Sequence, residues 1–422
     1  MTRVVVALDS LKGSIGAAEA SAAVAAGWQR ARPGDEVLLR PMADGGEGTL
    51  DAFAAAVSGA QRVPVTVRGP HGRPVAADWL LLPDGTGVVE LAATSGIELL
   101  GGQLRPWDAD TFGFGQAIAG ALDHGVERLV LGIGSSASTD GGAGVLTALG
   151  ARVLDAAGEL VVPGVRGLET AASVDLSQLR DLPPGGVVVL SDVTNPLCGP
   201  RGAAAVFGPQ KGLDALGVAA ADAALARFAA LVAGALTGVE GPGAERAGAA
   251  SARAAAAAAG ADAERAGSRR VRRLQLDTDR RAGQQRAHSA GADPATPGAG
   301  AAGGTGFALL AWGGELRPGA AEVATLIGLD AAIAGADLVV TGEGSYDGQS
   351  AAGKAPAHVA ALAATAGVSV ALIAGRVTAD ADTSAFAASL ALAELAGSAE
   401  ASLAAPARWL RVAGAELAAR AG

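Results

Sequence analysis

A run of small residues at positions 132–144, GIGSSASTDGGAG, has the composition of a loop that binds phosphate. It follows an apolar strand pattern and precedes an Ala/Leu-rich helical pattern, so backbone amides, hydroxyls and a helix N-terminus could converge on one anion. The run lacks the GK[ST] ending of a Walker A loop and matches only the loose dinucleotide form GxGxxA. A tight turn capped by Ser, Thr and Asp explains the same residues. The candidate phosphate ligands are Gly134, Ser135, Ser136, Ser138, Thr139, Gly141 and Gly142.

A second polar cluster follows another apolar strand pattern, in the segment SDVTNPLCGPRGAAAVFGPQKG. Phosphoryl transfer requires cations facing the transferred group, magnesium, and often a carboxylate beside the acceptor hydroxyl. Asp192 is therefore the first candidate for a general base or a metal ligand. The other polar candidates are Asn195, Arg201 and Lys211. Cys198 has no basic neighbour in sequence, so we interpret it as a packed residue rather than a nucleophile.

Two short loops near the N-terminus also carry charged side chains beside glycines. In DSLKGS, Lys12 could neutralise a substrate carboxylate or a phosphate, while Asp9 and Ser10 contact a hydroxyl or a metal. In ADGGEG, Asp44 and Glu47 flank two glycines, which suits contact with magnesium or with a substrate hydroxyl. A solvated lysine and an acid-capped helix start explain these residues without a ligand, and the local pattern does not decide between the two.

The segment GEGSYDGQSAAGKAP supplies a last polar set after a predicted strand. Its candidates are Glu343, Asp347, Gln349 and Lys354, and the alternative is a capped turn before the next helix. The four histidines show no spacing that is typical of a metal site. We therefore expect carboxylates to bind any metal, with Glu343 and Asp347 as candidates alongside Asp192.

These loops require strands that end at a common edge. Strand and helix patterns alternate at both ends of the chain, with strands predicted at residues 3–8, 37–41, 338–341 and 368–374. Between them, hairpin-like patterns are predicted at 63–91, helices at 111–124 and 214–233, and strands at 128–133 and 186–190. Because ligands of open α/β sheets bind at the carboxyl ends of strands, the polar loops above are candidate site elements.

The pattern predicts an α/β protein of two domains. A Rossmann-like domain is expected from residues 1–62 plus 298–422, with a second, mixed α/β domain inserted at 63–237. Residues 238–297 are rich in Ala, Gly and Arg and lack aromatic residues, which predicts a disordered, low-complexity insertion. A basic arm for an acidic partner is the functional alternative, but loops accept added length at little energetic cost.

Composition limits the class of protein. The chain of 422 residues exceeds the size at which single cores stop growing, roughly 250–300 residues. Its net charge of -10 argues against a nucleic-acid partner, and its single cysteine excludes a disulfide framework. The start lacks a basic segment followed by an apolar one, and we find no apolar run of membrane-spanning length. We therefore expect a cytoplasmic protein that binds no membrane.

Six segments, in one order, resemble the bacterial type I glycerate kinase family: ALDSLKGS, PMADGGEGTLDA, GIGSSASTDGGAGVLTALGA, LSDVTNPLCGPRGAAAVFGPQKG, PGAGAAGGTGFALLAW and VTGEGSYDGQSAAGKAP. The resemblance covers nearly the whole chain apart from residues 238–297, where relatives carry only a short link. It implies phosphorylation of D-glycerate by ATP and Mg²⁺, giving 2-phosphoglycerate or 3-phosphoglycerate, in a cleft between two α/β domains. A homodimer is one candidate for the oligomeric state.

Site roles follow from combining the resemblance with the chemistry of the loops. Glycerate has a carboxylate and two hydroxyls, which require a cation and hydrogen-bond acceptors. We assign catalytic roles to Asp192, Lys12 and Asp44. We assign substrate binding to Asp9, Ser10, Lys12, Asp44, Asn195 and Arg201. We assign nucleotide phosphates to Gly134, Ser135, Ser136, Ser138, Thr139, Gly141, Gly142 and Lys211, and the metal to Asp192, Asp347 and Glu343.

Two other functions account for part of the sequence. A dinucleotide-dependent dehydrogenase acting on a small hydroxy acid would use the GxGxxA match, with Asp155 at the spacing of a ribose-binding acid. It leaves DSLKGS, ADGGEG and GEGSYDGQS without a role. A sugar-acid-sensing binding protein is the non-enzymatic alternative, but the sequence has no DNA-binding motif or basic stripe.

Overall fold

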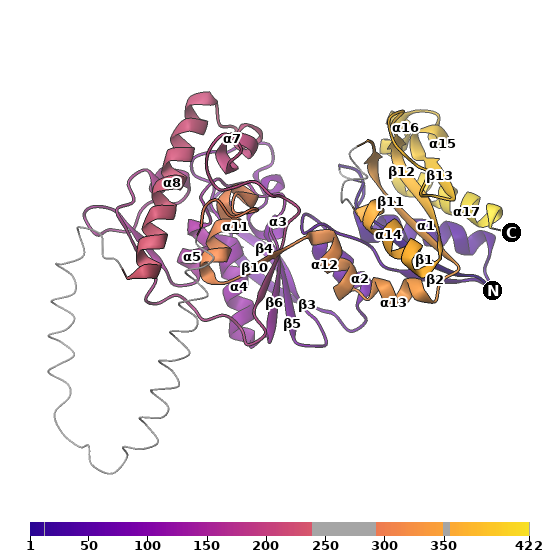
Figure 1. Cartoon of the computed structure of the whole chain (residues 1–422), viewed down its shortest axis with the longest axis horizontal. Coiled ribbons are helices and arrows are strands. Elements are labelled where there is room, and N and C mark those ends of the chain that lie inside the picture. The colour runs from indigo at the N-terminus through magenta and orange to yellow at the C-terminus, as the bar shows by residue number, and fades with distance from the viewer. Residues whose placement is uncertain (12, 239–292, 349–354, 422) are drawn as a thin grey trace, which may run out of the picture.

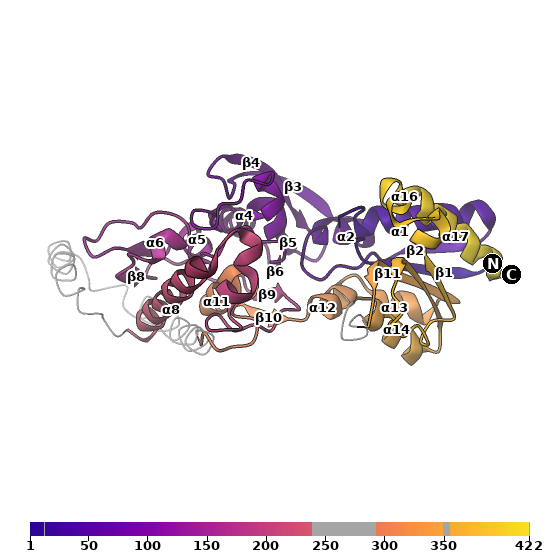
Figure 2. The same cartoon turned by 90° about the horizontal axis from the view of Figure 1, so that it is seen from above.

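The chain folds into two lobes that lie side by side along the long axis of the molecule (Figure 1). The computed structural model describes residues 1–11, 13–238, 293–348 and 355–421. The N- and C-termini lie together at one end, in both the front view and the view from above (Figure 2). Lys12, Gln349, Lys354 and residues 239–292 of the predicted insertion lie outside the described residues.

The first lobe is built around a parallel sheet to which both ends of the chain contribute. Its strand order is β13-β12-β11-β1-β2, and every pairing is parallel. The strands are β1 (Arg3–Leu8), β2 (Glu36–Leu39), β11 (Leu338–Tyr346), β12 (Ser369–Val377) and β13 (Ala388–Ala391). The apolar residues of β1 are fully buried on both faces, which is why their pattern is continuous rather than alternating.

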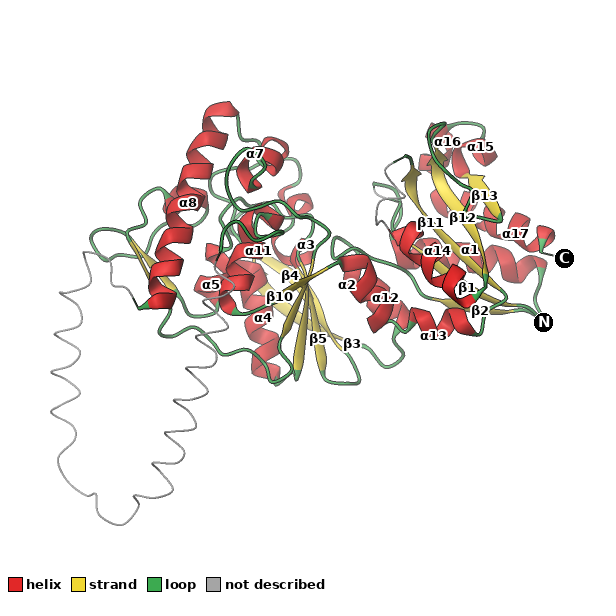
Figure 3. Cartoon of the chain, in the orientation of Figure 1, coloured by secondary structure: helices red, strands yellow, loops and turns green. Residues whose placement is uncertain are grey.

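Helices cover both faces of this sheet (Figure 3). On one face, Val4 and Val6 pack against α1 (Ala17–Ala31) and α17 (Pro406–Arg420). On the other face, Val5 packs in a cluster with residues of the remaining helices. These are α2 (Thr49–Ala56), α12 (Gly319–Leu326), α13 (Leu329–Ala334) and α14 (Ala355–Ala366). Two short helices, α15 (Leu392–Ala396) and α16 (Ala399–Ala404), connect β13 to α17.

The second lobe contains a mixed sheet in the order β10-β9-β6-β5-β4-β3. Its strands are β3 (Gln61–Arg68), β4 (Pro74–Leu81), β5 (Thr86–Glu90), β6 (Arg128–Gly132), β9 (Val187–Leu190) and β10 (Glu315–Arg317). The hairpin-like region predicted at residues 63–91 pairs antiparallel, whereas β5, β6, β9 and β10 are parallel. The α/β fold class is confirmed.

One face of the second sheet is covered by α4 (Phe112–His124), α5 (Ala143–Ala148), α8 (Ala215–Thr237) and α11 (Ala301–Trp312). Short elements complete the lobe: α3 (Leu91–Ser95), η1 (Ile97–Leu100), β7 (Arg152–Leu154), α6 (Val165–Leu168), β8 (Ser173–Asp175), α7 (Ala203–Phe207) and η2 (Pro209–Lys211). Although Asp222 and Arg227 interrupt its apolar run, α8 is long and apolar enough by length and composition to cross a membrane. Because Leu225, Phe228 and Val232 bury one face of α8 in the core, we interpret it as a core helix.

The predicted domain boundary at residue 298 is wrong. Helix α11 packs in the core of the second lobe, with Trp312 fully buried, and β10 pairs with β9 at the edge of the second sheet. Pro294 already belongs to this lobe, since its carbonyl accepts the Leu197 N–H. An all-apolar helix must be buried by whichever sheet lies beside it, and its sequence does not name that sheet. The return to the first lobe therefore comes after β10.

The lobes share a continuous apolar cluster. Val88 and Val130 of the second sheet lie in the same cluster as Phe53 of α2, Val323 of α12 and Val339 of the first sheet. Helices α2 and α12 lie between the two sheets in the front view (Figure 1). The division into two domains that fold independently stays a prediction.

Candidate active site

A cavity of about 540 Å³ lies where strands of the first sheet end and the loop after β9 approaches them. Its polar lining residues are Asp9, Ser10, Ser14, Asp44, Asp192, Glu343, Ser345, Asp347, Arg376 and Ser402. We call this cavity the acidic pocket. Four of the loops selected from the sequence converge on it, which fits the rule that ligands of α/β sheets bind at the carboxyl ends of strands.

Strand pairing brings the first and last of these loops together. The Asp9 N–H donates to the Gly342 carbonyl at 2.9 Å, which ties the loop after β1 to β11. A Cβ on Gly342 would lie 1.8 Å from the Ile373 carbonyl oxygen, so β11 and β12 approach closely only because this residue is glycine. Glu343 follows directly in β11 and is buried, and Asp347 comes just after the strand. The register of the sheet therefore sets the positions of three acids.

Asp44 and Asp192 meet at the start of α12. The Gly319 N–H donates to Oδ1 of Asp192 at 2.7 Å, and a Cβ on Gly319 would lie 2.0 Å from the Asp44 carbonyl oxygen. Asp44 follows a strand of the first sheet and Asp192 follows a strand of the second. The pocket therefore combines carboxylates from both lobes beside the N-terminus of a helix, where partial positive charge stabilises anions.

The donor set of the acidic pocket fits a hard cation such as Mg²⁺, because all its acidic ligands are carboxylate oxygens. Within the described ranges, no group of three His, Cys, Asp or Glu side chains has the geometry of a complete metal site. Mg²⁺ in phosphoryl-transfer enzymes commonly takes one or two carboxylates and completes its shell with phosphate oxygens and water. One or two of the predicted ligands Asp192, Asp347 and Glu343 would supply such a partial set, whereas the three together form no site.

Sequence reasoning missed Arg376, which lines the same pocket. It lies near the carboxyl end of β12, two residues past the strand predicted at 368–374, so the rule that selected the other loops could have selected it. Its Nε donates to Oγ of Ser345 at 2.8 Å. Ser345 was also missed, although it stands between two predicted metal ligands.

Most residues of the glycine-rich loop at positions 132–144 are buried. Ser136, Ser138 and Thr139 are buried, whereas Gly134 and Ser135 remain accessible. None of the predicted phosphate ligands in this loop lines the acidic pocket. The loop nevertheless contacts a pocket loop directly, since the Gly134 N–H donates to the Gly45 carbonyl at 2.9 Å.

Lys211 lies behind the glycine-rich loop with 3% of its surface exposed. Its Nζ donates to Oγ of Ser136 at 2.7 Å and to the Ser138 carbonyl. Burial lowers the pKa of Lys211 to about 7, and the nearby Asp140 carboxylate acts in the opposite direction. This placement argues against the direct phosphate contact that we predicted for Lys211, because both acceptors of its ammonium are protein atoms.

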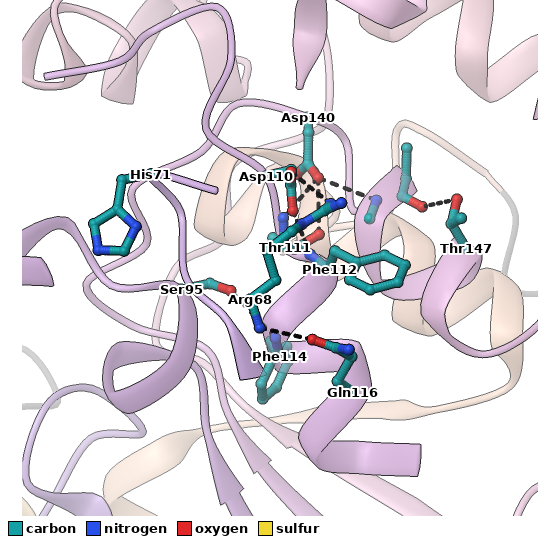
Figure 4. A network of polar contacts seen from close by, with 12 residues as sticks. Arg68, His71, Ser95, Asp110, Thr111, Phe112, Phe114, Gln116, Asp140 and Thr147 are labelled. Carbon is teal, nitrogen blue, oxygen red and sulfur yellow. Dashed lines mark hydrogen bonds and ion pairs between the residues drawn. The ribbon is translucent and has the colours of Figure 1, made fainter. Parts of the chain in front are cut away.

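Asp140 serves as an internal cap rather than a ligand. Its Oδ2 accepts the N–H and the hydroxyl of Thr111 at 2.9 and 2.8 Å, and its Oδ1 accepts the Gly142 N–H at 3.1 Å. Figure 4 shows Asp140 and Asp110 converging beside Arg68 at the start of α4. The hydroxyls of Ser138 and Thr139 are buried with no hydrogen-bond partner among the described residues. The capped-turn alternative thus explains much of this loop, and these two hydroxyls keep their donors for another group.

Two other predicted substrate ligands lie elsewhere. The Asn195 side-chain amide donates to the Arg201 carbonyl at 2.8 Å, and neither residue lines the acidic pocket. Asp155 is half-buried and accepts the backbone N–H groups of Ala157 and Glu159 in its own turn. Burial raises the pKa of Cys198 to about 11, which agrees with its interpretation as a packed residue. The predicted role of Lys12 falls on a residue outside the described part of the chain.

Glu90 links the second sheet to a pocket loop. It is buried in β5, and its carboxylate accepts the N–H groups of Gly48 and Leu50 at the start of α2, at 3.3 and 2.9 Å. Burial raises the pKa of Glu90 to about 7, against the two hydrogen bonds, which lower it. Sequence reasoning did not select Glu90, because a single acid that ends a strand resembles many surface acids.

Comparison with known proteins gives consistent matches. A family model described as the glycerate kinase family matches residues 4–279 and 271–421. Glycerate kinase of Bacillus subtilis (strain 168) is 37% identical over 384 residues, which cover 90% of this chain and 86% of the relative. Glycerate 2-kinase of Escherichia coli (strain K12) is 36% identical over 382 residues, with the same two shares. A crystal structure from Salmonella typhimurium LT2, provisionally assigned as glycerate kinase 2, has a TM-score of 0.75 and 35% identity and covers 100% of this chain and 98% of that one.

Proposed function

Since the chain belongs to the glycerate kinase family, we propose that it phosphorylates D-glycerate with ATP in the acidic pocket. The observation that carries this location is the convergence of acids from both lobes on one cavity, including Asp44 and Asp192 at Gly319. The six segments that resemble this family support placement in the bacterial type I branch. Because ATP is its co-substrate, we place the enzyme in the cytoplasm.

Asp192 is our candidate for the general base. It is exposed to the pocket, and one of its oxygens is held by the Gly319 N–H, which orients the carboxylate. A carboxylate so placed can accept the proton of the glycerate hydroxyl that attacks the γ-phosphate. Asp9, Ser10 and Asp44 line the same cavity and can accept or donate hydrogen bonds to the substrate hydroxyls. We propose that Mg²⁺ takes one or two carboxylates from the set Asp192, Asp347 and Glu343; it would neutralise charge on the transferred phosphoryl group.

The glycine-rich loop is proposed to contact the nucleotide through Gly134 and Ser135, its accessible residues. The buried hydroxyls of Ser138 and Thr139 could reach a phosphate only after the loop moved relative to α11, because Gly303 of α11 approaches the Ser138 carbonyl closely. The dehydrogenase alternative has less support, since the matching family is a kinase family and Asp155 caps its own turn.

A coupled ADP-release assay tests this function. With ATP, Mg²⁺ and D-glycerate, we expect glycerate-dependent ADP formation, and none when glycerate is omitted. Phosphorus NMR of the product identifies the phosphorylated hydroxyl; the name of the Escherichia coli relative favours 2-phosphoglycerate. A folded protein that forms no ADP in response to D-glycerate would refute the proposal.

A further inference from the structure

We infer that Arg376 binds the carboxylate of D-glycerate and makes the enzyme select an acid over an uncharged polyol or amide. This inference rests on the proposed function, because it assigns one end of the proposed substrate to one side of the acidic pocket.

The placement of Arg376 is fixed by the sheet. Its neighbour Gly375 approaches β11 so closely that a Cβ there would lie 2.4 Å from the Gly344 carbonyl oxygen. Arg376 therefore leaves the end of β12 at a defined point and enters the pocket that Asp9, Asp44 and Asp192 also line. The position is set by backbone packing rather than by a flexible loop.

One hydrogen bond to the described part of the chain orients the guanidinium of Arg376. Nε donates to Oγ of Ser345 at 2.8 Å, and the side chain is exposed. Its two terminal Nη atoms make no hydrogen bond or ion pair with any residue that the structure describes. A guanidinium held at Nε presents its remaining N–H groups to a ligand, and their planar arrangement matches a carboxylate.

Arg376 places a positive charge in a pocket that is otherwise lined by acidic and uncharged residues in the described part of the chain. The described lining contains five carboxylates, Asp9, Asp44, Asp192, Glu343 and Asp347. Arg376 is the only Lys, Arg or His side chain among the lining residues that the structure describes. A guanidinium attracts a carboxylate, so Arg376 is the side chain of the described lining that is suited to bind the carboxylate of glycerate.

The γ-phosphate of ATP is the other anion that Arg376 could contact. Two observations favour the carboxylate. Arg376 and Ser345 lie on first-sheet strands, whereas the glycine-rich loop proposed for the nucleotide follows β6 of the second sheet. In addition, Asp192, the proposed base for a glycerate hydroxyl, lines the same cavity as Arg376. The two anions make different kinetic predictions.

The test is steady-state kinetics on Arg376→Gln, with Arg376→Lys as the conservative variant. We expect Arg376→Gln to raise the KM for D-glycerate roughly 10- to 100-fold, with the KM for ATP within about 2-fold of the wild-type value. Arg376→Lys should recover part of the loss, because it restores the charge but not the planar fork. Arg227→Gln is the matched control, since Arg227 is an exposed arginine on α8 outside the pocket.

A second readout separates carboxylate binding from a structural role. The ratio of kcat/KM for D-glycerate to that for its neutral amide should be large in the wild type and fall roughly 10-fold or more in Arg376→Gln. An unchanged ratio, or a rise in the KM for ATP instead of glycerate, would overturn the inference. If the wild type itself shows no glycerate-dependent turnover, the proposed function fails, and that outcome is distinct from an active wild type with an unaffected Arg376→Gln.

Discussion

The loops of the acidic pocket and the glycine-rich loop both come after buried parallel strands. The pocket loops line a cavity, whereas most polar side chains of the glycine-rich loop are buried in the protein. Around the pocket, glycines such as Gly319 and Gly342 let backbones touch, while the acidic side chains point into a cavity. In the loop at 132–144, the same kind of residue lets α11 and Lys211 pack against the chain and bury its hydroxyls. A run of small residues therefore permits close approach, and its neighbours decide whether a ligand or protein fills the space.

The two regions predict different responses to mutation. Changes in the acidic pocket should mainly affect turnover, because the side chains face the cavity proposed to bind the substrate. Changes around the glycine-rich loop should mainly affect stability, because its polar groups are buried and bonded within the protein.

The largest effect is expected from Asp192→Asn. Asparagine keeps an oxygen that can accept the Gly319 N–H, but it loses the charge and the basicity of the carboxylate. We expect kcat to fall roughly 10²- to 10⁴-fold, with the midpoint of thermal unfolding nearly unchanged. Asp155→Asn is the matched control, since Asp155 also accepts backbone N–H groups but lies outside the pocket. Normal turnover in Asp192→Asn would remove Asp192 from the base and metal roles.

Lys211→Ala should show the opposite behaviour. The substitution leaves the Ser136 hydroxyl and the Ser138 carbonyl without their buried donor and opens a cavity behind the loop. We expect the free energy of unfolding, measured in urea, to fall by about 2–4 kcal/mol. Arg227→Ala, on the exposed face of α8, should change it by less than about 0.5 kcal/mol. Equal stability of the two variants would show that Lys211 does not hold the loop.

Glu90 lies where the two regions meet, and its titration should be measurable. Burial raises its pKa from 4.5 to about 7 in the folded protein, so the folded state binds the proton more tightly than the unfolded state. The resulting stabilisation is fully present below pH 4.5 and is lost as the pH rises through about 7. The wild type should therefore lose up to about 3 kcal/mol more than Glu90→Gln between pH 4.5 and 7.

Urea unfolding across this range provides the measurement, with Glu47→Gln as the control because Glu47 is an exposed acid near the same helix start. Both Glu47→Gln and the wild type should keep the pH dependence that Glu90→Gln loses. Identical curves for all three proteins would show that Glu90 does not titrate in this window.

The smallest effect is expected from residues 241–291. Their Ala-, Gly- and Arg-rich composition predicts an insertion that the protein tolerates. Replacing them with a flexible linker should leave kcat and both KM values within about 2-fold of those of the full chain. A folded but inactive replacement would assign this segment a part in the reaction.

The sequence predicted the strands and the loops that follow them better than it predicted which segments pack together in the fold. Strand and helix patterns fixed the α/β class, and the rule on carboxyl ends selected Asp9, Asp44, Asp192 and Asp347, all of which line one cavity. Local patterns carry this information because each loop directly follows its strand.

Long-range packing accounts for the errors. Nothing in the local sequence of α11 shows which sheet buries it, so the boundary at 298 was misplaced. Lys211 was predicted to bind phosphate because its local sequence does not reveal its burial behind the loop. That burial depends on residues about 75 positions away in the chain. Arg376 was overlooked because a single arginine after an apolar strand carries no glycine-rich signature.

The most direct test is a crystal structure with a non-hydrolysable ATP analogue, Mg²⁺ and D-glycerate. We predict that glycerate occupies the acidic pocket, with its carboxylate on Arg376 and a hydroxyl within hydrogen-bond distance of Asp192. Glycerate bound outside this cavity, with Asp192 remote from both its hydroxyls and the nucleotide, would contradict the account.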